Sequence, residues 1–134
     1  MFHRLSIALT TSLALLPLSA TADATTQLQA VYLTQGVERF DAADGAALWQ
    51  QQFTHAKSGQ QRSCTLCHTA QLGNPGKHAR TGKPIEPMAP SVNPQRLTDK
   101  AKIEKWLKRN CKWTLGRECT PQEKGDLLSF IRNQ

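Results

Sequence analysis

A five-residue motif, Cys64-Thr65-Leu66-Cys67-His68, constrains the fold of this chain more than any other feature. The pattern C-x-x-C-H is the attachment signature of a c-type haem. Its two thiols can form thioether bonds with two vinyl groups on one edge of the porphyrin, and the histidine that follows then lies beneath the iron. We therefore predict that Cys64 and Cys67 bind one covalent haem c and that His68 is its proximal axial ligand.

Two other chemistries use paired cysteines, and the rest of the sequence favours neither of them. A thioredoxin-like C-x-x-C needs a β-α-β context, whereas this chain has no run of alternating β-branched residues. A zinc site needs a second C-x-x-C or a spaced histidine pair, whereas Cys111 and Cys119 are eight positions apart. Haem attachment is therefore the interpretation that fits the motif best.

The N-terminal segment has the anatomy of a secretory signal. One arginine precedes an apolar run over residues 5–18, which contains a proline and is followed by SATADA. This run is shorter than the roughly 20 residues that a membrane-spanning helix needs. The two A-x-A sequences predict cleavage near Ala22 or Ala24. We expect a signal peptide over residues 1–22 and one periplasmic, soluble haem domain over residues 23–134, without stable membrane insertion.

Helical patterns precede the haem motif. Asp44 is a candidate N-cap for a helix over residues 45–53, in which Trp49 and Phe53 share one face. Residues 25–34 contain a weaker apolar stripe, formed by Leu28, Val31 and Tyr32.

Two further helices are predicted after the haem motif. Five of the seven prolines fall between residues 73 and 94, and we expect an extended loop there rather than regular structure. Thr98 is a candidate cap for the next helix, whose apolar stripe contains Ile103, Trp106 and Leu107. Thr120, Pro121 and Glu123 form a complete capping box at the start of the last helix. These patterns predict an all-α, class I cytochrome c-like fold with three to four helices around a covalently bound haem.

The C-x-x-C-H motif supplies only one axial ligand, so the other face of the iron needs a second one. Met88 lies twenty residues after His68, far enough for a loop to pass around the porphyrin edge. His55 and His78 are also candidates by residue type. From residue types and spacing alone, the second ligand stays open among these side chains.

The stretch over residues 44–131 resembles the sphaeroides haem protein family, a group of small exported c-type cytochromes. The likeness rests on C-x-x-C-H and on the segments RTGK, APS, KWLKRNC and GRECTPQEK. It implies that Asn110, the asparagine of RNC, is the second axial ligand, and that Cys111 and Cys119 form a disulfide. It also implies that Met88 is an apolar loop contact rather than a ligand.

An asparagine ligand predicts a function beyond plain electron transfer. A neutral amide offers a hard, weak donor that should hold ferric iron better than ferrous iron. Reduction should then favour detachment of Asn110 and open a site for O2, NO or CO, as the resemblance also implies. One alternative is a haem enzyme that acts on NO, O2 or a similar oxidant, although the sequence shows no distal histidine or arginine constellation of the peroxidase kind. Another is a plain electron carrier with Met88 as ligand.

The charge of the chain bears on its partners. The formal net charge is +7, and from residue 96 onward ten Lys and Arg residues stand against five Asp and Glu residues. An exported protein rarely meets nucleic acid, so we expect an acidic protein partner, or else a solvated helix face with none. The resemblance implies a dihaem cytochrome c as the electron donor. Arg80 and Lys83 are candidates for binding the haem propionates through charge-assisted hydrogen bonds.

Overall fold

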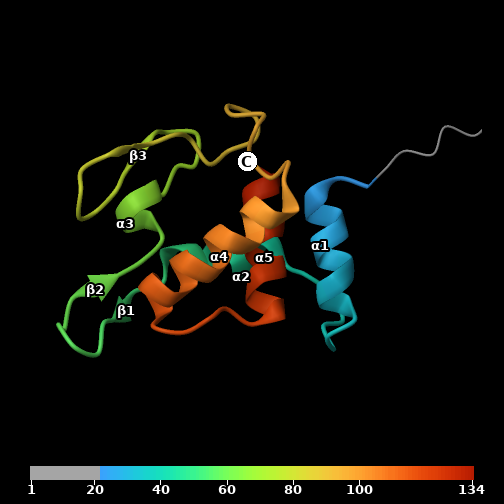
Figure 1. The fold of residues 1–134 in the computed structure, drawn as a ribbon, viewed down its shortest axis with the longest axis horizontal. Helices are drawn as coiled ribbons and strands as arrows, with labels where there is room; N and C mark the ends of the chain where they lie inside the picture. Colours follow the sequence, from blue (N-terminus) through green and yellow to red (C-terminus); the bar gives the residue numbers. More distant parts are fainter. Residues whose placement is uncertain (1–21) are drawn as a thin grey trace, which may run out of the picture.

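Five helices and two short hairpins form the part of the chain that this computed structural model describes, residues 22–134 (Figure 1). The helices are α1 (Ala24–Leu33), α2 (Ala42–Gln50), α3 (Thr65–His68), α4 (Lys100–Leu115) and α5 (Pro121–Arg132). The predicted all-α class is confirmed. The structure has one helix more than the three to four predicted, because α3 is a single turn of four residues and shows no helical periodicity in the sequence. Except for Ala22, the predicted signal peptide lies outside the described residues.

Both hairpins lie on the side of the molecule that carries the haem motif. The strands are β1 (Phe53–Thr54), β2 (Gln61–Arg62), β3 (Gly76–Lys77) and β4 (Pro84–Ile85). β1 pairs antiparallel with β2, with Phe53 opposite Arg62, and β3 pairs with β4, with Gly76 opposite Ile85. The proline-rich stretch is therefore not wholly irregular, because the β3–β4 hairpin forms inside it.

The N-cap of α2 is Asp41, three residues before the predicted cap. The Asp41 carboxylate accepts a hydrogen bond from the Ala43 amide at 2.7 Å, and the Asp41 amide donates to the Asp126 carboxylate at 2.7 Å. This contact with α5 fixes Asp41 as the cap, while Asp44 lies in the first turn. The helix also ends earlier than predicted, at Gln50. Phe53 therefore belongs to β1 and does not share a helix face with Trp49, contrary to our prediction.

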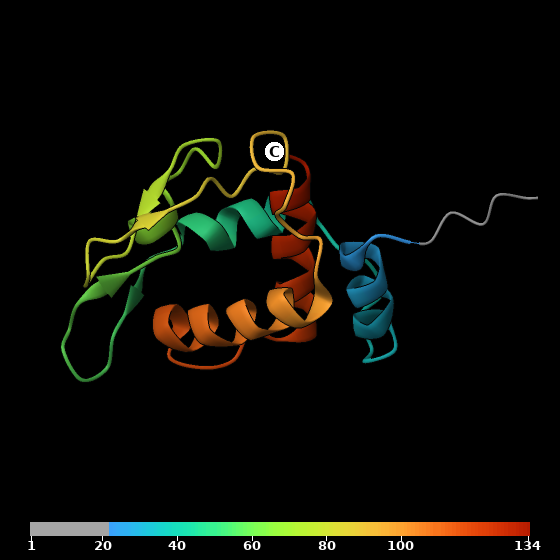
Figure 2. The same ribbon diagram turned by 45° about the horizontal axis from the view of Figure 1, so that its top comes forward.

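The contact between α2 and α5 depends on a glycine. Figure 2 shows α2 running up against α5. A Cβ atom at Gly45 would lie 2.1 Å from the Asp126 carbonyl oxygen and 2.9 Å from the Phe130 Cβ atom. The backbones can therefore approach this closely only if residue 45 has no side chain.

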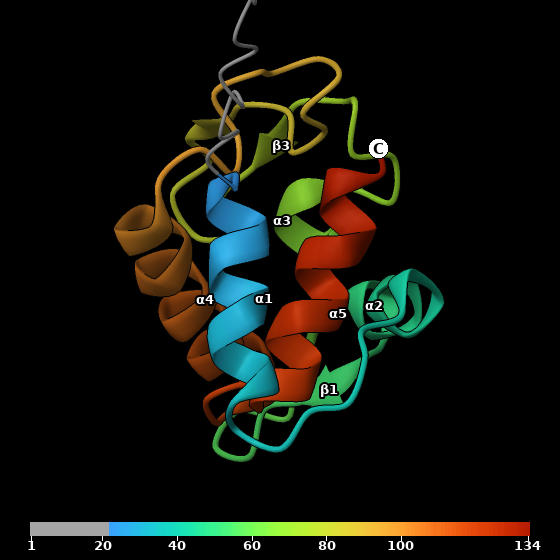
Figure 3. The same cartoon turned by 90° about the vertical axis from the view of Figure 1, so that its right-hand side faces the viewer.

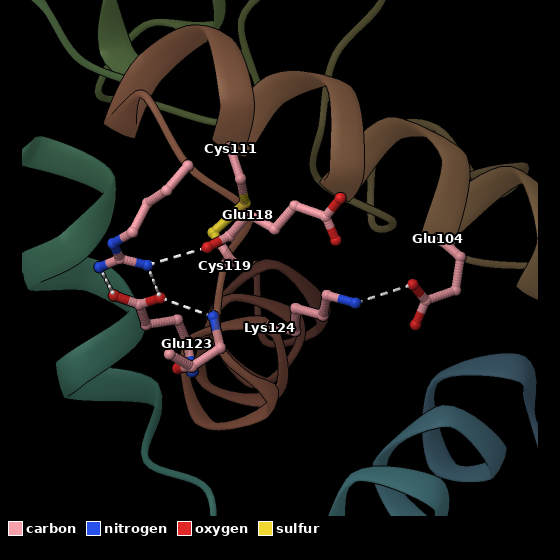
Figure 4. The surroundings of a disulfide bond; sticks show 8 residues. Glu104, Cys111, Glu118, Cys119, Glu123 and Lys124 are labelled. Carbon is pink, nitrogen blue, oxygen red and sulfur yellow. Dashed lines mark hydrogen bonds and ion pairs between the residues drawn. A yellow bond between two sulfur atoms is a disulfide. The ribbon is translucent and has the colours of Figure 1, made fainter.

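A second layer of the core joins α1 to α4 and α5 (Figure 3). Its buried residues are Ala24, Leu28, Tyr32, Ile103 and Leu128. Val31, which the sequence placed on the apolar stripe of α1, is exposed. The Tyr32 hydroxyl donates to the Glu104 carboxylate, which also pairs with the Lys124 ammonium at 3.0 Å (Figure 4). One carboxylate on α4 thus links α1 to α5.

Helix α4 begins one residue later than its predicted cap implies. Its N-cap is Asp99 rather than Thr98, with the carboxylate accepting from the Lys102 amide at 3.0 Å. The helix continues to Leu115 and stops at Gly116, whose φ of 78° is left-handed. The capping box at the start of α5 forms as predicted. None of the helices within residues 22–134 combines the length and apolar character needed to cross a membrane.

Candidate haem site

The haem motif forms a single helical turn. Cys64 is the N-cap of α3, and its carbonyl oxygen accepts from the amides of Cys67 at 3.3 Å and His68 at 3.0 Å. Both cysteines are half-buried and unbonded to each other. Burial raises the pKa of the Cys64 thiol to about 11, whereas reactive dithiols have lowered values. This environment fits attachment of a haem better than a redox-active dithiol.

Two neighbouring residues, Trp49 and Gly76, hold the turn that carries His68. The Trp49 ring on α2 lies 5.5 Å from the imidazole, centroid to centroid, and its indole N–H donates to the Thr69 carbonyl at 3.0 Å. On the other side, Gly76 in β3 approaches so closely that a Cβ atom there would lie 2.1 Å from the Cys67 carbonyl oxygen. The α3 turn is thus held between α2 and the β3–β4 hairpin.

Within residues 22–134, one ring nitrogen of His68 has no hydrogen-bond partner. Its Nδ1 atom is buried and neither accepts nor donates a hydrogen bond among the described residues. Burial, and then the positive charge of Arg96, lower the pKa of His68 to about 4, which keeps the ring neutral. A neutral imidazole is the form that ligates a metal. Residues 22–134 contain no cluster of three or more His, Cys, Asp or Glu side chains, so a porphyrin fits a single histidine here better than a bare ion does.

A mostly apolar cavity brings the predicted ligands together. Cys64, Cys67 and His68 line it from the α3 turn, and Asn110 lines it from α4. Figure 2 shows α4 lying across the molecule from α2 and α3. Further apolar walls come from α2, α4 and α5, through Leu48, Trp49, Ile103, Leu107, Leu127 and Ile131. These surroundings suit a flat, largely apolar group between His68 and α4.

Asn110 lies inside α4 rather than at its end. The helix continues for five more residues, and its C-cap is Gly116. Its position shares one helix face with the cavity-lining residues Ile103, Trp106, Leu107 and Thr114. Trp106, expected in the apolar stripe, lines the cavity but remains 44% exposed.

The other candidate ligands differ in position. Met88 also lines the cavity, and its amide donates to the Leu72 carbonyl at 2.9 Å. His55 lies outside the cavity wall and pairs with Ser58, with 2.9 Å between Nδ1 and Oγ. His78 is exposed, and its Nδ1 accepts from the Thr81 amide at 3.1 Å. The structure thus leaves Asn110 and Met88, and neither His55 nor His78, beside the cavity.

A disulfide joins Cys111, the residue after Asn110, to Cys119, with their Cα atoms 5.5 Å apart (Figure 4). It closes the connection between α4 and α5. In the chain-entropy model a loop of this size contributes about 2.5 kcal/mol to the free energy of unfolding. The bond therefore holds the C-terminal part of α4, which carries Asn110, close to α5.

Some residues at the site were not singled out from the sequence. Arg96 lines the cavity, whereas the candidate propionate partners Arg80 and Lys83 are exposed near the tip of the β3–β4 hairpin and do not. Arg62 donates to the Trp113 carbonyl at 2.8 Å and lies 4.5 Å from the centre of its ring. Neither Arg96 nor Arg62 could be recognised from the sequence, because a single arginine in a loop or a short strand belongs to no periodic pattern.

The fold and the site together define a c-type cytochrome of the class I-like type, with covalently bound haem c. Residues 35–131 match the family described as "Domain of unknown function (DUF1924)". The chain is 46% identical over 108 residues to cytochrome c-type protein SHP of Cereibacter sphaeroides, covering 81% of this chain and 82% of that one. The chain therefore belongs to the sphaeroides haem protein family, as its motifs predicted.

Solved structures agree with this assignment. The structure of oxidised SHP, described as an oxygen-binding cytochrome c, has a TM-score of 0.76 and 44% identity, covering 85% of this chain and all of that chain. Oxidised cytochrome c'' from Methylophilus methylotrophus has a TM-score of 0.72 and 31% identity, covering 83% and 94% of the two chains. In sequence, cytochrome c'' is 38% identical over 88 residues, which span 66% of this chain and 60% of that protein.

Proposed function

We propose that this protein is an exported electron-transfer cytochrome that binds a small gas when it is reduced. Cys64 and Cys67 attach the haem, with His68 and Asn110 as axial ligands. One observation carries the proposal: His68 and Asn110 line the same cavity from two separately held helices. The haem supplies an iron that changes oxidation state and can take up a diatomic molecule at a free coordination position. In this proposal the chain would supply a strong imidazole ligand from His68 and a weak amide ligand from Asn110.

The relatives support the same proposal. SHP is described as an oxygen-binding cytochrome c, and a solution structure of cytochrome c'' was described in terms of haem-ligand detachment. An amide ligand gives a physical reason for detachment, because its hard donor atom favours ferric over ferrous iron. We infer that O2, NO and CO are the gases that fit this site.

Optical spectra of both oxidation states test the gas-binding proposal. We expect a low-spin ferric spectrum that CO does not change, and a five-coordinate ferrous spectrum that changes fully when CO is added. The ferrous change carries the test, because ferric haem does not bind CO whatever its ligands, and the proposal has Asn110 leave the iron only on reduction. A low-spin ferrous spectrum that CO leaves unchanged would identify an ordinary electron carrier with two permanent ligands.

The surface of α4 supports an acidic redox partner, which the family likeness suggests is a dihaem cytochrome c. This helix has six basic residues and one acidic one. Lys105 and Arg109 flank the exposed ring of Trp106 at 5.7 and 5.0 Å from its centre, and this ring lines the cavity. A partner docked on these residues would therefore lie close to the haem.

The salt dependence of reduction measures this docking. With an acidic dihaem cytochrome as donor, the bimolecular rate constant should fall about tenfold or more between low and physiological ionic strength, because exposed charges attract less strongly when screened. The variant Lys105→Gln/Arg109→Gln should reduce the rate at low salt and flatten this dependence. Matched substitutions at Lys57 and Lys77, which are exposed and outside α4, should change little. If the Lys57 and Lys77 substitutions change the rate of reduction as much as the Lys105 and Arg109 substitutions do, α4 is a solvated helix face without a partner.

The start of α1 favours one of the two proposed cleavage positions. Asp23 caps the helix through its carboxylate and the Thr26 amide at 3.0 Å, and Ala24 is buried in the core. Cleavage after Ala24 would remove both, whereas cleavage after Ala22 keeps them. We therefore expect the protein isolated from the periplasm to begin at Asp23, as measured by intact mass. A mass that corresponds to a start at Thr25, or to the uncleaved chain, would contradict this.

A further inference from the structure

Arg96 is a cation held at the edge of the haem cavity. It lies in the loop before α4 and lines the cavity together with His68 and Asn110. Its Nε–H donates to the Pro87 carbonyl at 2.8 Å and its Nη2 donates to the Glu86 carbonyl at 2.6 Å. These two bonds orient the guanidinium but use only part of its hydrogen-bonding capacity, since Arg has five N–H donors.

No carboxylate within residues 22–134 forms an ion pair with this guanidinium. The four ion pairs of the described chain involve other basic residues. Burial lowers the pKa of Arg96, and the Glu86 carboxylate opposes this only in part. Partial burial costs a cation part of its hydration, and a nearby anion offsets that cost. The position of Arg96 therefore calls for an anionic group inside the cavity.

We propose that Arg96 binds a haem propionate, through the guanidinium N–H groups that the Pro87 and Glu86 carbonyls leave free. A propionate is a carboxylate at the edge of the porphyrin, and Arg–carboxylate pairs are strong when the hydrogen bonds are charge-assisted. Arg96 and His68 line the same cavity, so a porphyrin bound at that histidine would share this space with the guanidinium.

The other cations near the site fit this role less well. Lys102 lines the cavity, but it lies on the exposed side of α4. Arg80 and Lys83 are exposed and do not line the cavity. The remaining charged group in the cavity wall is Asp99, whose carboxylate is engaged with the amide of Lys102 at 3.0 Å. Of the two basic residues that line the cavity, Arg96 is thus the one that is partly desolvated, and it has no acidic partner among the described residues.

The substitutions Arg96→Gln and Arg96→Lys test the proposal on the haem-loaded protein. Both variants lose the paired geometry at Pro87 and Glu86, but only Arg96→Gln loses the positive charge. A cation beside the haem favours the ferrous state, which carries one positive charge fewer. We therefore expect a lower reduction potential in Arg96→Gln and a potential closer to that of the parent in Arg96→Lys. The propionate bending band in the resonance Raman spectrum should shift in both variants, because the hydrogen bonds to the propionate change.

Matched variants at the other cations complete the test. Arg80→Gln, Lys83→Gln and Lys102→Gln each remove one charge and should leave the propionate band in place. Equal potentials in Arg96→Gln and Arg96→Lys, together with an unshifted band in both, would overturn the proposal. A band that shifts in Arg80→Gln or Lys83→Gln, and stays in place in the Arg96 variants, would assign the propionate to the hairpin instead. If Arg96→Gln does not accumulate, the band of Arg96→Lys against the parent decides the question.

Discussion

Replacement of Asn110 by alanine is expected to remove the second axial ligand from the ferric protein and to leave the ferrous protein nearly unchanged. Asn110 lines the cavity from the interior of α4, and alanine keeps the helix while removing the amide. The ferric spectrum should change from low spin to a high-spin form with water or no sixth ligand. The ferrous spectrum and the CO affinity should stay within about twofold, because the amide is already detached in that state.

Met88 provides the matched control for this experiment. It lines the same cavity and is the other side chain there that could bind iron. Met88→Leu preserves the volume and removes the sulfur, so it should leave both spectra unchanged. The parent ferric protein should also lack the near-infrared iron–sulfur charge-transfer band. If this band is present and disappears in Met88→Leu, the protein is an ordinary methionine-ligated electron carrier.

The second large effect is expected at Gly45, where intrinsic helix propensity and packing predict opposite signs. Alanine is favoured over glycine inside a helix by about 1 kcal/mol, so propensity alone predicts that Gly45→Ala stabilises the protein. However, the new Cβ atom would lie 2.1 Å from the Asp126 carbonyl oxygen. Neither backbone can move without separating α2 from α5. We expect a net loss of about 2–3 kcal/mol in the free energy of unfolding, measured by denaturant titration of the haem-loaded protein.

Ala47 allows the propensity term to be measured in the same helix. It is exposed on α2, so Ala47→Gly should cost about 1 kcal/mol from propensity alone. Gly45→Ala should therefore destabilise more than Ala47→Gly does, although it improves the propensity. A Gly45→Ala protein as stable as the parent, or more stable, would show that α2 and α5 do not depend on this close approach.

Much of the fold could be predicted because its signals are local. The capping box at Thr120 and Glu123 and the haem motif itself are short patterns with defined backbone consequences. The N-cap of α2 could not be predicted, since Asp41 and Asp44 are equally good caps. The choice is made by Asp126, which lies 85 positions further along the chain.

The site was partly predictable for a related reason. Cys64, Cys67 and His68 are predicted from their spacing, whereas Asn110 carries no chemical signal of its own and is predicted only through a family likeness. Arg96 was missed because no pattern distinguishes it from Arg80, and only the fold places one beside the cavity and the other at a hairpin.

The way in which α4 is fastened has a consequence for the speed of ligand exchange. Glu104 ties its first half to α1 and α5, the Cys111–Cys119 disulfide ties its second half to α5, and Arg62 donates to the carbonyl of Trp113 at 2.8 Å. If Asn110 leaves the iron on reduction, as we propose, a helix held in this way should not shift along its axis. The movement left to Asn110 is rotation about its own side-chain bonds, and such rotations take picoseconds to nanoseconds at partly exposed positions. Once reduction has weakened the bond to the amide, the site should open without a slow conformational step, so that gas uptake is limited by arrival of the gas.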